Sequence, residues 1–164
     1  MDESIERQFT ALKKGLLKIY GGDSLKICQS SELEMIICGH NSDNYNFQEL
    51  QMIAKYDDGY GANRQIIMYY LVKTHHRWFW EIIESFSLDH KKKLLTFVTA
   101  SDRIPLNGLK SLTFVIQRNG PDSDRLPTAL TCFGRLLLPE YETKEKLEKL
   151  LIIAIDNASG FGLI

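Results

Sequence analysis

The sequence predicts a mixed α/β fold, and three observations support this prediction. Apolar residues recur at helical spacing through most of the first hundred residues. Between Leu112 and Leu138, short runs rich in β-branched, aromatic and leucine residues alternate with turn residues, a pattern typical of strands. A last amphipathic helix is predicted behind Thr143, because threonine favours helix N-termini.

Composition excludes several classes of protein. The 164 residues suit one domain, or one domain and a fragment of another. Twenty Lys and Arg residues against 21 Asp and Glu residues give a net charge of −1, so charge does not favour non-specific nucleic-acid binding. The longest apolar run, Leu150–Ile155, is far too short to span a membrane. We therefore expect neither a nucleic-acid nor a membrane partner.

The cysteines and the N-terminus bear on the cellular compartment. Cys28, Cys38 and Cys132 show no C-x-x-C spacing, which argues against a disulfide framework and against a zinc cluster. The first residues are acidic and lack the basic-then-apolar order of a signal peptide. We expect free thiols in a reducing compartment, and a location in the cytoplasm or also in the nucleus.

Two helices and a linker are predicted in the first 44 residues. The first helix has an apolar stripe formed by Ile5, Phe9, Leu12, Leu16 and Ile19. Gly21 and Gly22 end it. Ser31 and Glu34 have capping-box spacing ahead of a short second helix with Leu33, Ile36 and Ile37. The polar run Cys38–Asn44 is the best linker candidate.

The central part of the chain is also predicted to be helical. The pattern resumes over residues 47–54 and is broken by residues 56–61. A long helix is predicted over residues 62–86, with Ile67, Leu71, Thr74, Trp78, Ile82 and Phe86 on one face. Ser87 favours the start of a further helix that carries Leu94, Leu95 and Val98.

In the last third of the chain, strands are predicted before the final helix. A strand is predicted over residues 112–117, followed by a turn-rich loop over residues 119–124. Two short strands are predicted over residues 131–133 and 136–138, on either side of Gly134. The final helix should bury Leu147, Leu150, Leu151, Ala154 and Ala158. Gly160 lies where its C-cap is expected.

Histidines do not form a convincing metal site in this sequence. His75 and His76 are adjacent, so on a helix they point about 100° apart, and no acidic or cysteine ligand lies nearby at ligand spacing. We expect half-buried or solvent-facing histidines, no bound metal and no cofactor. Lys91–Lys93 is interpreted as a solvated helix face. The glycines at 21 and 22 lack the lysine and spacing of a phosphate-binding loop.

Cys132 is the strongest candidate for chemistry. A free cysteine is most often a small buried hydrophobe, but Cys132 follows a proline-bearing loop and precedes Phe133-Gly134, a setting that favours an exposed, fixed thiol. Thr131 beside it could hydrogen-bond a neighbouring carbonyl or nucleophile. No His or Asp lies within five residues, which gives little support to a cysteine protease. Exchange with a thioester needs less activation, because the leaving group is already good.

The residues around Cys132 resemble a known signature. Leu126–Phe133 followed by Leu136–Tyr141 is similar to the active-site sequence of HECT-type ubiquitin-protein ligases. Other matching segments follow in family order: Glu32–Gly39, Tyr60 with Ala62-Asn63, Trp78–Glu81, Phe97–Thr99, Asp102–Pro105 and Gly160–Ile164. The resemblance covers nearly the whole chain.

The resemblance implies a fold and a role for particular residues. Residues 43–164 would form the C-lobe of a HECT domain, a small mixed sheet with flanking helices, and residues 1–42 the helical remnant of the N-lobe and the hinge. Cys132 would take ubiquitin from a ubiquitin-conjugating enzyme as a thioester and pass it to a lysine of a protein substrate. Thr131 would shape the thioester site. Phe161 would position the loaded lobe, or simply anchor the end of the last helix.

Departures from the family pattern leave a second hypothesis open. Many members have His at the position of Leu130 and Asn at that of Gly134, and we expect Gly134 to loosen the backbone. The segment Met68–His76 has no family counterpart, and we expect it to lengthen a helix and to carry an exposed or partner-binding apolar patch near Tyr69–Val72. The family's site for the conjugating enzyme lies in N-lobe sequence that is not in this chain. The alternative is therefore a truncated, catalytically impaired module that binds ubiquitin or a ligase.

Overall fold

The computed structural model describes residues 3–20, 27–42, 45–57 and 67–158. The chain divides into two compact units, Met1–Gly39 and His40–Ile164. This division falls slightly before the predicted boundary after residue 42. Whether the first unit is the remnant of an N-lobe stays a prediction.

The first unit consists of two described helices, α1 (Glu3–Tyr20) and α2 (Ser30–Cys38), as the sequence predicts. The start of α2 differs from the expectation. Its N-cap is Gln29, whose backbone N–H donates to Glu32 Oε2 at 2.7 Å. The predicted pairing of Ser31 with Glu34 is wrong, because the helix begins before Ser31 and places that residue inside its first turn.

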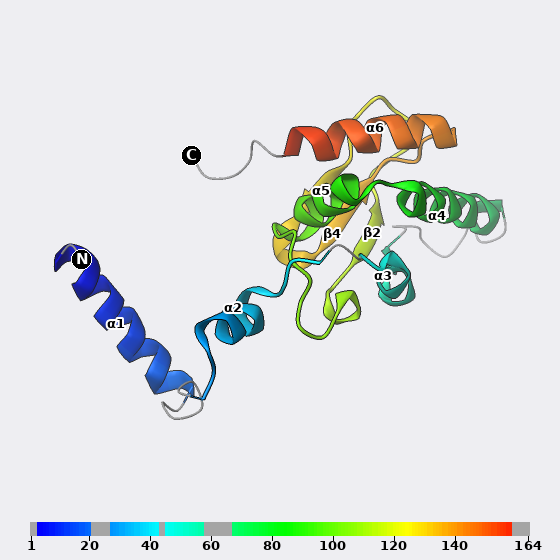
Figure 1. Cartoon of the computed structure of the whole chain (residues 1–164). Coiled ribbons are helices and arrows are strands. Elements are labelled where there is room, and N and C mark those ends of the chain that lie inside the picture. The colour runs from blue at the N-terminus through cyan, green and yellow to red at the C-terminus, as the bar shows by residue number, and fades with distance from the viewer. Residues whose placement is uncertain (1–2, 21–26, 43–44, 58–66, 159–164) are drawn as a thin grey trace. The chain divides into compact units, whose positions relative to one another are not determined.

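The second unit is built on a four-stranded sheet with the order β1-β2-β4-β3 (Figure 1). The strands are β1 (Lys55–Asp57), β2 (Val115–Arg118), β3 (Thr128–Leu130) and β4 (Arg135–Leu138). The pairs β1–β2 and β2–β4 are parallel, whereas β3 runs antiparallel to β4. The small mixed sheet expected from the family resemblance is therefore confirmed.

Four α-helices of this unit are described: α3 (Phe47–Ile53), α4 (Ile67–Ser85), α5 (Leu88–Thr99) and α6 (Lys144–Asn157). The two predicted caps are confirmed. The hydroxyls of Ser87 and Thr143 each accept a backbone N–H three residues ahead at 3.2 Å, as N-caps do. Two short 3-10 turns, η2 (Leu109–Ser111) and η3 (Thr131–Phe133), complete the described elements.

Helix α4 includes the segment Met68–His76, which we expect to have no counterpart in the family pattern. The expectation that this segment is helical is confirmed, and its lengthening of the helix relative to the family stays a prediction. The apolar patch expected near Tyr69–Val72 concerns side chains outside the described part of the structure. None of the helices in the described ranges combines the length and the apolar character needed to cross a membrane.

A single apolar core joins the sheet to the helices. Helices α4 and α6 pack together, as do α5 and α6 (Figure 1). Alternation along the strands turns Ile116, Leu136 and Leu138 into this core and leaves Val115 and Leu137 half-exposed on the opposite face. Each leucine that is fully buried stabilises the fold by about 1.5–3 kcal/mol relative to an exposed one.

Two sequence predictions fail at the strands. The predicted strand over residues 131–133 is wrong: these residues form the 3-10 turn η3, and the strand lies earlier, over Thr128–Leu130. Strand β1 occupies residues that were predicted to break the helical pattern. It has only three residues, and its ladder partner is β2, almost sixty residues away along the chain. Local pattern therefore cannot reveal it.

Candidate active site

Cys132 lies at the centre of the turn η3, which joins β3 to β4. Thr131, Cys132 and Phe133 are all exposed, and Phe133 exposes 67% of its surface. Helix α5 packs against this turn and against β3. The predicted exposure of the Cys132 thiol is confirmed. The turn presents the sulfur to solvent on the edge of the folded unit.

Gly134 holds the turn in place through its backbone conformation and hydrogen bonds. Its backbone is left-handed (φ 55°, ψ 40°), its N–H donates to the Thr131 carbonyl at 3.2 Å, and its carbonyl accepts the Val115 N–H at 2.9 Å. A Cβ at this position would lie 2.0 Å from the carbonyl oxygen of Thr113. The expectation that Gly134 loosens the backbone is wrong. Absence of a side chain lets the turn approach β2, and hydrogen bonds on both sides then hold it there.

Tyr141 holds the end of the β3–β4 hairpin that lies away from the Cys132 turn. Its side chain is fully buried, and its hydroxyl donates to the Arg125 carbonyl in the loop that leads into β3. The carbonyl of Tyr141 accepts a hydrogen bond from His75 Nε2 of α4 at 2.6 Å. Since a carbonyl only accepts, His75 carries its proton on Nε2. Burial raises the pKa of the Tyr141 phenol, which stays protonated and able to donate.

Ion pairs attach the same loop to α6. Lys146 Nζ lies 2.9 Å from Asp122 Oδ2 and 3.1 Å from Asp124 Oδ1. The hydrogen bond from Lys146 lowers the pKa of Asp122, and those carboxylates in turn raise the pKa of Lys146. Asp122 also accepts the Glu142 backbone N–H at 3.2 Å. The segment before β3 is therefore connected to α6 as well as to Tyr141.

Two exposed apolar side chains flank the thiol in sequence. Leu130 exposes 45% of its surface and lies at the end of β3, just before the turn, and Phe133 follows the thiol. Arg135 contributes charge on the open face of the sheet. Its Nη1 lies 2.8 Å from Asp57 Oδ2 and is also hydrogen-bonded to the Gln117 side chain.

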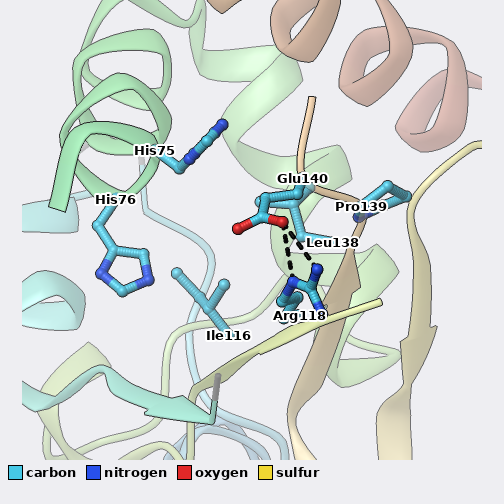
Figure 2. Close-up of a pocket in the computed structure, with 7 residues that line it drawn as sticks. All are labelled: His75, His76, Ile116, Arg118, Leu138, Pro139 and Glu140. Atoms are coloured by element: carbon cyan, nitrogen blue, oxygen red, sulfur yellow. Dashed lines mark hydrogen bonds and ion pairs between the residues drawn. The ribbon is translucent and has the colours of Figure 1, made fainter. Parts of the chain in front are cut away.

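A small cleft lies at the opposite end of the strands (Figure 2). His75 and His76 of α4 form one side of it, and Arg118 and Glu140 the other. Arg118 Nε and Nη2 both lie 2.9 Å from Glu140 Oε2. The ring of His76 stacks on Tyr56 with centroids 3.7 Å apart. Both histidines are half-buried, as expected, and across the described ranges no three potential ligands are grouped to hold a metal ion.

The predicted site residues have different outcomes. Thr131 and Cys132 lie together in the turn, and the carbonyl of Thr131 closes it. Phe161 lies outside the described residues. Sequence reasoning missed the contributions of His75 and Tyr141. Tyr141 does fall within the run that resembles the family signature, but nothing in the sequence indicates that it contacts Arg125.

Together, the fold and the exposed cysteine define a small α/β domain that presents a thiol on a hairpin turn. The model of the HECT-domain (ubiquitin-transferase) family matches residues 1–164. The chain belongs to this family.

Similar proteins carry related names. The chain is 40% identical to the human probable E3 ubiquitin-protein ligase HERC3 over 98% of its own length and 14% of the relative. It is 37% identical to the human probable E3 ubiquitin-protein ligase HECTD2, over 99% of this chain and 20% of that protein. Identity to the probable E3 ubiquitin-protein ligase HUL4 of Eremothecium gossypii is 34%, over 99% and 18% of the two chains. The chain thus spans a fifth or less of these relatives.

Proposed function

We propose that this chain carries ubiquitin as a thioester on Cys132 and transfers it to a lysine of a protein substrate. The observation that carries the proposal is the exposed Cys132 in a turn pinned by Gly134, in a chain that belongs to the HECT-domain family. An exposed thiol can meet a thioester held by a second protein, whereas a buried thiol cannot.

The first step is a thiol–thioester exchange. Cys132 Sγ, as thiolate, attacks the carbonyl carbon of the ubiquitin C-terminus on the cysteine of a conjugating enzyme. A new S–C bond forms, and the bond to the conjugating enzyme's sulfur breaks. The departing thiolate takes up a proton equivalent to the one that Cys132 released. The leaving group is as good as the nucleophile, so this step needs no strong base at the turn.

The second step forms an amide. A neutral lysine amine attacks the same carbonyl carbon, the C–N bond forms, and the C–S bond breaks to regenerate the Cys132 thiolate. The amine gives up its proton to solvent or to a base of the assembled complex. Covalent catalysis of this kind divides one difficult transfer into two easier ones.

Other parts of the proposal extend from the family resemblance. Thr131 shapes the thioester site from the preceding position, and Phe161 positions the loaded lobe for transfer. The partners are ubiquitin, a ubiquitin-conjugating enzyme and a protein substrate that offers a lysine. The proposed location is the cytoplasm or also the nucleus.

A gel assay tests the proposal. The chain is incubated with activating enzyme, a conjugating enzyme, ubiquitin and ATP, and the products are separated without reductant. We expect a ubiquitin adduct that disappears with reductant and is absent in Cys132→Ala. Cys132→Ser should give an oxyester adduct that survives reductant, because the serine hydroxyl replaces the thiol at the same carbonyl.

The other two cysteines supply matched controls. Cys38 is exposed like Cys132, and Cys28 is half-buried. Both Cys28→Ala and Cys38→Ala should keep the adduct. An adduct that depends on Cys38 would contradict the assignment to Cys132. If no adduct forms and the chain still binds ubiquitin or a HECT ligase, the alternative of a binding module is supported instead.

A further inference from the structure

Two hydrogen bonds in series connect helix α4 to the segment that leads to Cys132. His75 Nε2 donates to the Tyr141 carbonyl at 2.6 Å, and the Tyr141 hydroxyl donates to the Arg125 carbonyl. The two bonds link positions 66 and 16 residues apart in sequence. Tyr141 is 0% exposed, so its ring has little freedom to move independently of the groups that it bonds.

This connection acts on the weakest part of the hairpin. Strand β3 has three residues, lies at the edge of the sheet and forms a ladder only with β4. Its register with β4 runs from Thr128 opposite Leu137 to Leu130 opposite Arg135. Arg125 lies three residues before this ladder. The turn end is fixed by Gly134, and the Arg125–Tyr141 bond fixes the other end together with the ion pairs of Asp122 and Asp124 with Lys146.

We propose that His75 and Tyr141 are positioning residues for Cys132. They hold the entrance of β3 in place and so keep the Cys132 turn in one conformation. The expected effect on ubiquitin loading of Cys132 rests on the proposed function. The expected effect on the conformation of the hairpin does not. His75 belongs to the segment Met68–His76, which we expect to have no counterpart in the family pattern.

The neighbouring histidine offers a matched control. His76 lies on the same helix and lines the same cleft (Figure 2). Its ring stacks on Tyr56 of β1. Truncating either histidine removes a ring from the cleft. Only truncation of His75 removes the hydrogen bond to the Tyr141 carbonyl.

The first test measures the hairpin directly and does not need ubiquitin. Hydrogen exchange is followed at the amides of β3, with the amides of β2 as internal reference. Tyr141→Phe and His75→Ala should each speed exchange in β3 by about threefold to tenfold, as expected for the loss of one hydrogen bond. Tyr141→Phe keeps the buried ring, and thermal unfolding verifies that each variant is folded. If β3 exchange in His75→Ala equals that of the unmodified chain, the proposal is overturned.

A conservative replacement distinguishes donation from packing. The amide nitrogen of Gln can donate from nearly the position of histidine Nε2, so His75→Gln should restore slow β3 exchange and His76→Ala should leave it unchanged. The double variant His75→Ala with Tyr141→Phe should exchange hardly faster than Tyr141→Phe, because the bonds act in series. If the effects of the two substitutions on β3 exchange were additive, or if His75→Gln did not restore slow exchange, the two hydrogen bonds would not act in series.

The second test measures the reactivity of the Cys132 thiol. In a chain with Cys28→Ser and Cys38→Ser, alkylation of Cys132 and ubiquitin loading are compared for the same variants. Ubiquitin loading should fall about threefold or more in His75→Ala and recover in His75→Gln, with alkylation changed much less. If the unmodified chain loads no ubiquitin, the proposed function fails while the hydrogen-exchange result still decides the positioning role. Equal loading in all folded variants would overturn the positioning role.

Discussion

Helices α1 (Glu3–Tyr20) and α6 (Lys144–Asn157) belong to different units of the chain, and both carry an apolar stripe at helical spacing. In α6, Leu147, Leu151 and Ile155 are at most 1% exposed. In α1, Leu12 is 68% exposed and Ile19 is 79% exposed. Periodicity identifies both helices equally well, because it reports which face is apolar.

What periodicity does not report is whether the opposing surface is present. Helix α6 packs on α4 and α5, whose own apolar faces belong to the same core. Among residues 5–19 and 27–39, for which burial is described, only Gly39 is buried. The comparison shows that an amphipathic sequence predicts a helix with an apolar face, but not that this face is buried. In the described residues, the apolar face of α6 is buried within its own unit, and that of α1 is exposed. The following predictions test how sharp this difference is.

The largest effect is expected from truncating the core of α6. Leu151→Ala removes a fully buried side chain and should lower the free energy of unfolding by about 2–5 kcal/mol. Leu12→Ala, the matched change in α1, should stay within about 0.5 kcal/mol. Urea unfolding followed by Trp fluorescence reports the second unit, and hydrogen exchange at the α1 amides reports the first. A comparable cost for Leu12→Ala would mean that the α1 stripe is covered in solution.

Glycines give a second, smaller contrast. Gly134→Ala combines a left-handed backbone (φ 55°) with a Cβ 2.0 Å from Thr113 O, and should destabilise by about 1–3 kcal/mol or more. Gly120→Ala shares the positive φ (89°) but meets nothing within 4 Å, so it isolates the backbone cost. Gly15→Ala lies inside α1 with open space around it and should stabilise that helix by about 0.5–1 kcal/mol.

These three substitutions are compared by thermal unfolding and by the helical circular dichroism signal. Gly134→Ala should cost clearly more than Gly120→Ala, because only the former forces the Cys132 turn away from β2. Equal costs for the two would show that the contact with Thr113 is not what holds the turn. A destabilising Gly15→Ala would show that the environment of α1 is more crowded in solution than in this structure.

Much of the fold could be predicted from local sequence. The helices follow from apolar spacing, and the caps at Ser87 and Thr143 follow from side chains that accept a nearby N–H. The exposed setting of Cys132 follows from its position between a proline-bearing loop and Phe133-Gly134. In each case the forces that decide the structure act within a few residues along the chain.

The remaining features depend on distant contacts. Strand β1 exists because β2 pairs with it, and the turn at Cys132 exists because Gly134 approaches Thr113, some twenty residues upstream. The bond from His75 to the Tyr141 carbonyl spans 66 residues. Such contacts leave no period and no local composition bias, so one sequence cannot reveal them.

The smallest predicted effect concerns charge in the second unit. Asp122 accepts hydrogen bonds from Lys146 Nζ and from the Glu142 N–H, and the bond from Lys146 lowers its pKa below the ordinary 3.8. A lowered pKa in the folded state means that the ionised form is favoured by folding. The stabilisation is therefore fully present above pH 3.8 and is lost as the pH falls through the lowered value.

Asp122→Asn should therefore be modestly less stable at pH 7, by an amount typical of an exposed ion pair. Its deficit relative to the unmodified chain should shrink as the pH falls below 3.8, because the aspartate then loses its charge. Asp89→Asn should change with pH in the same direction, since the hydrogen bond from Lys93 also lowers the pKa of Asp89. Urea midpoints measured from pH 7 to pH 2 with the Trp signal decide the outcome. A deficit that does not change with pH would mean that Asp122 stabilises the loop before β3 through its shape and neutral hydrogen bonds, and not through its charge.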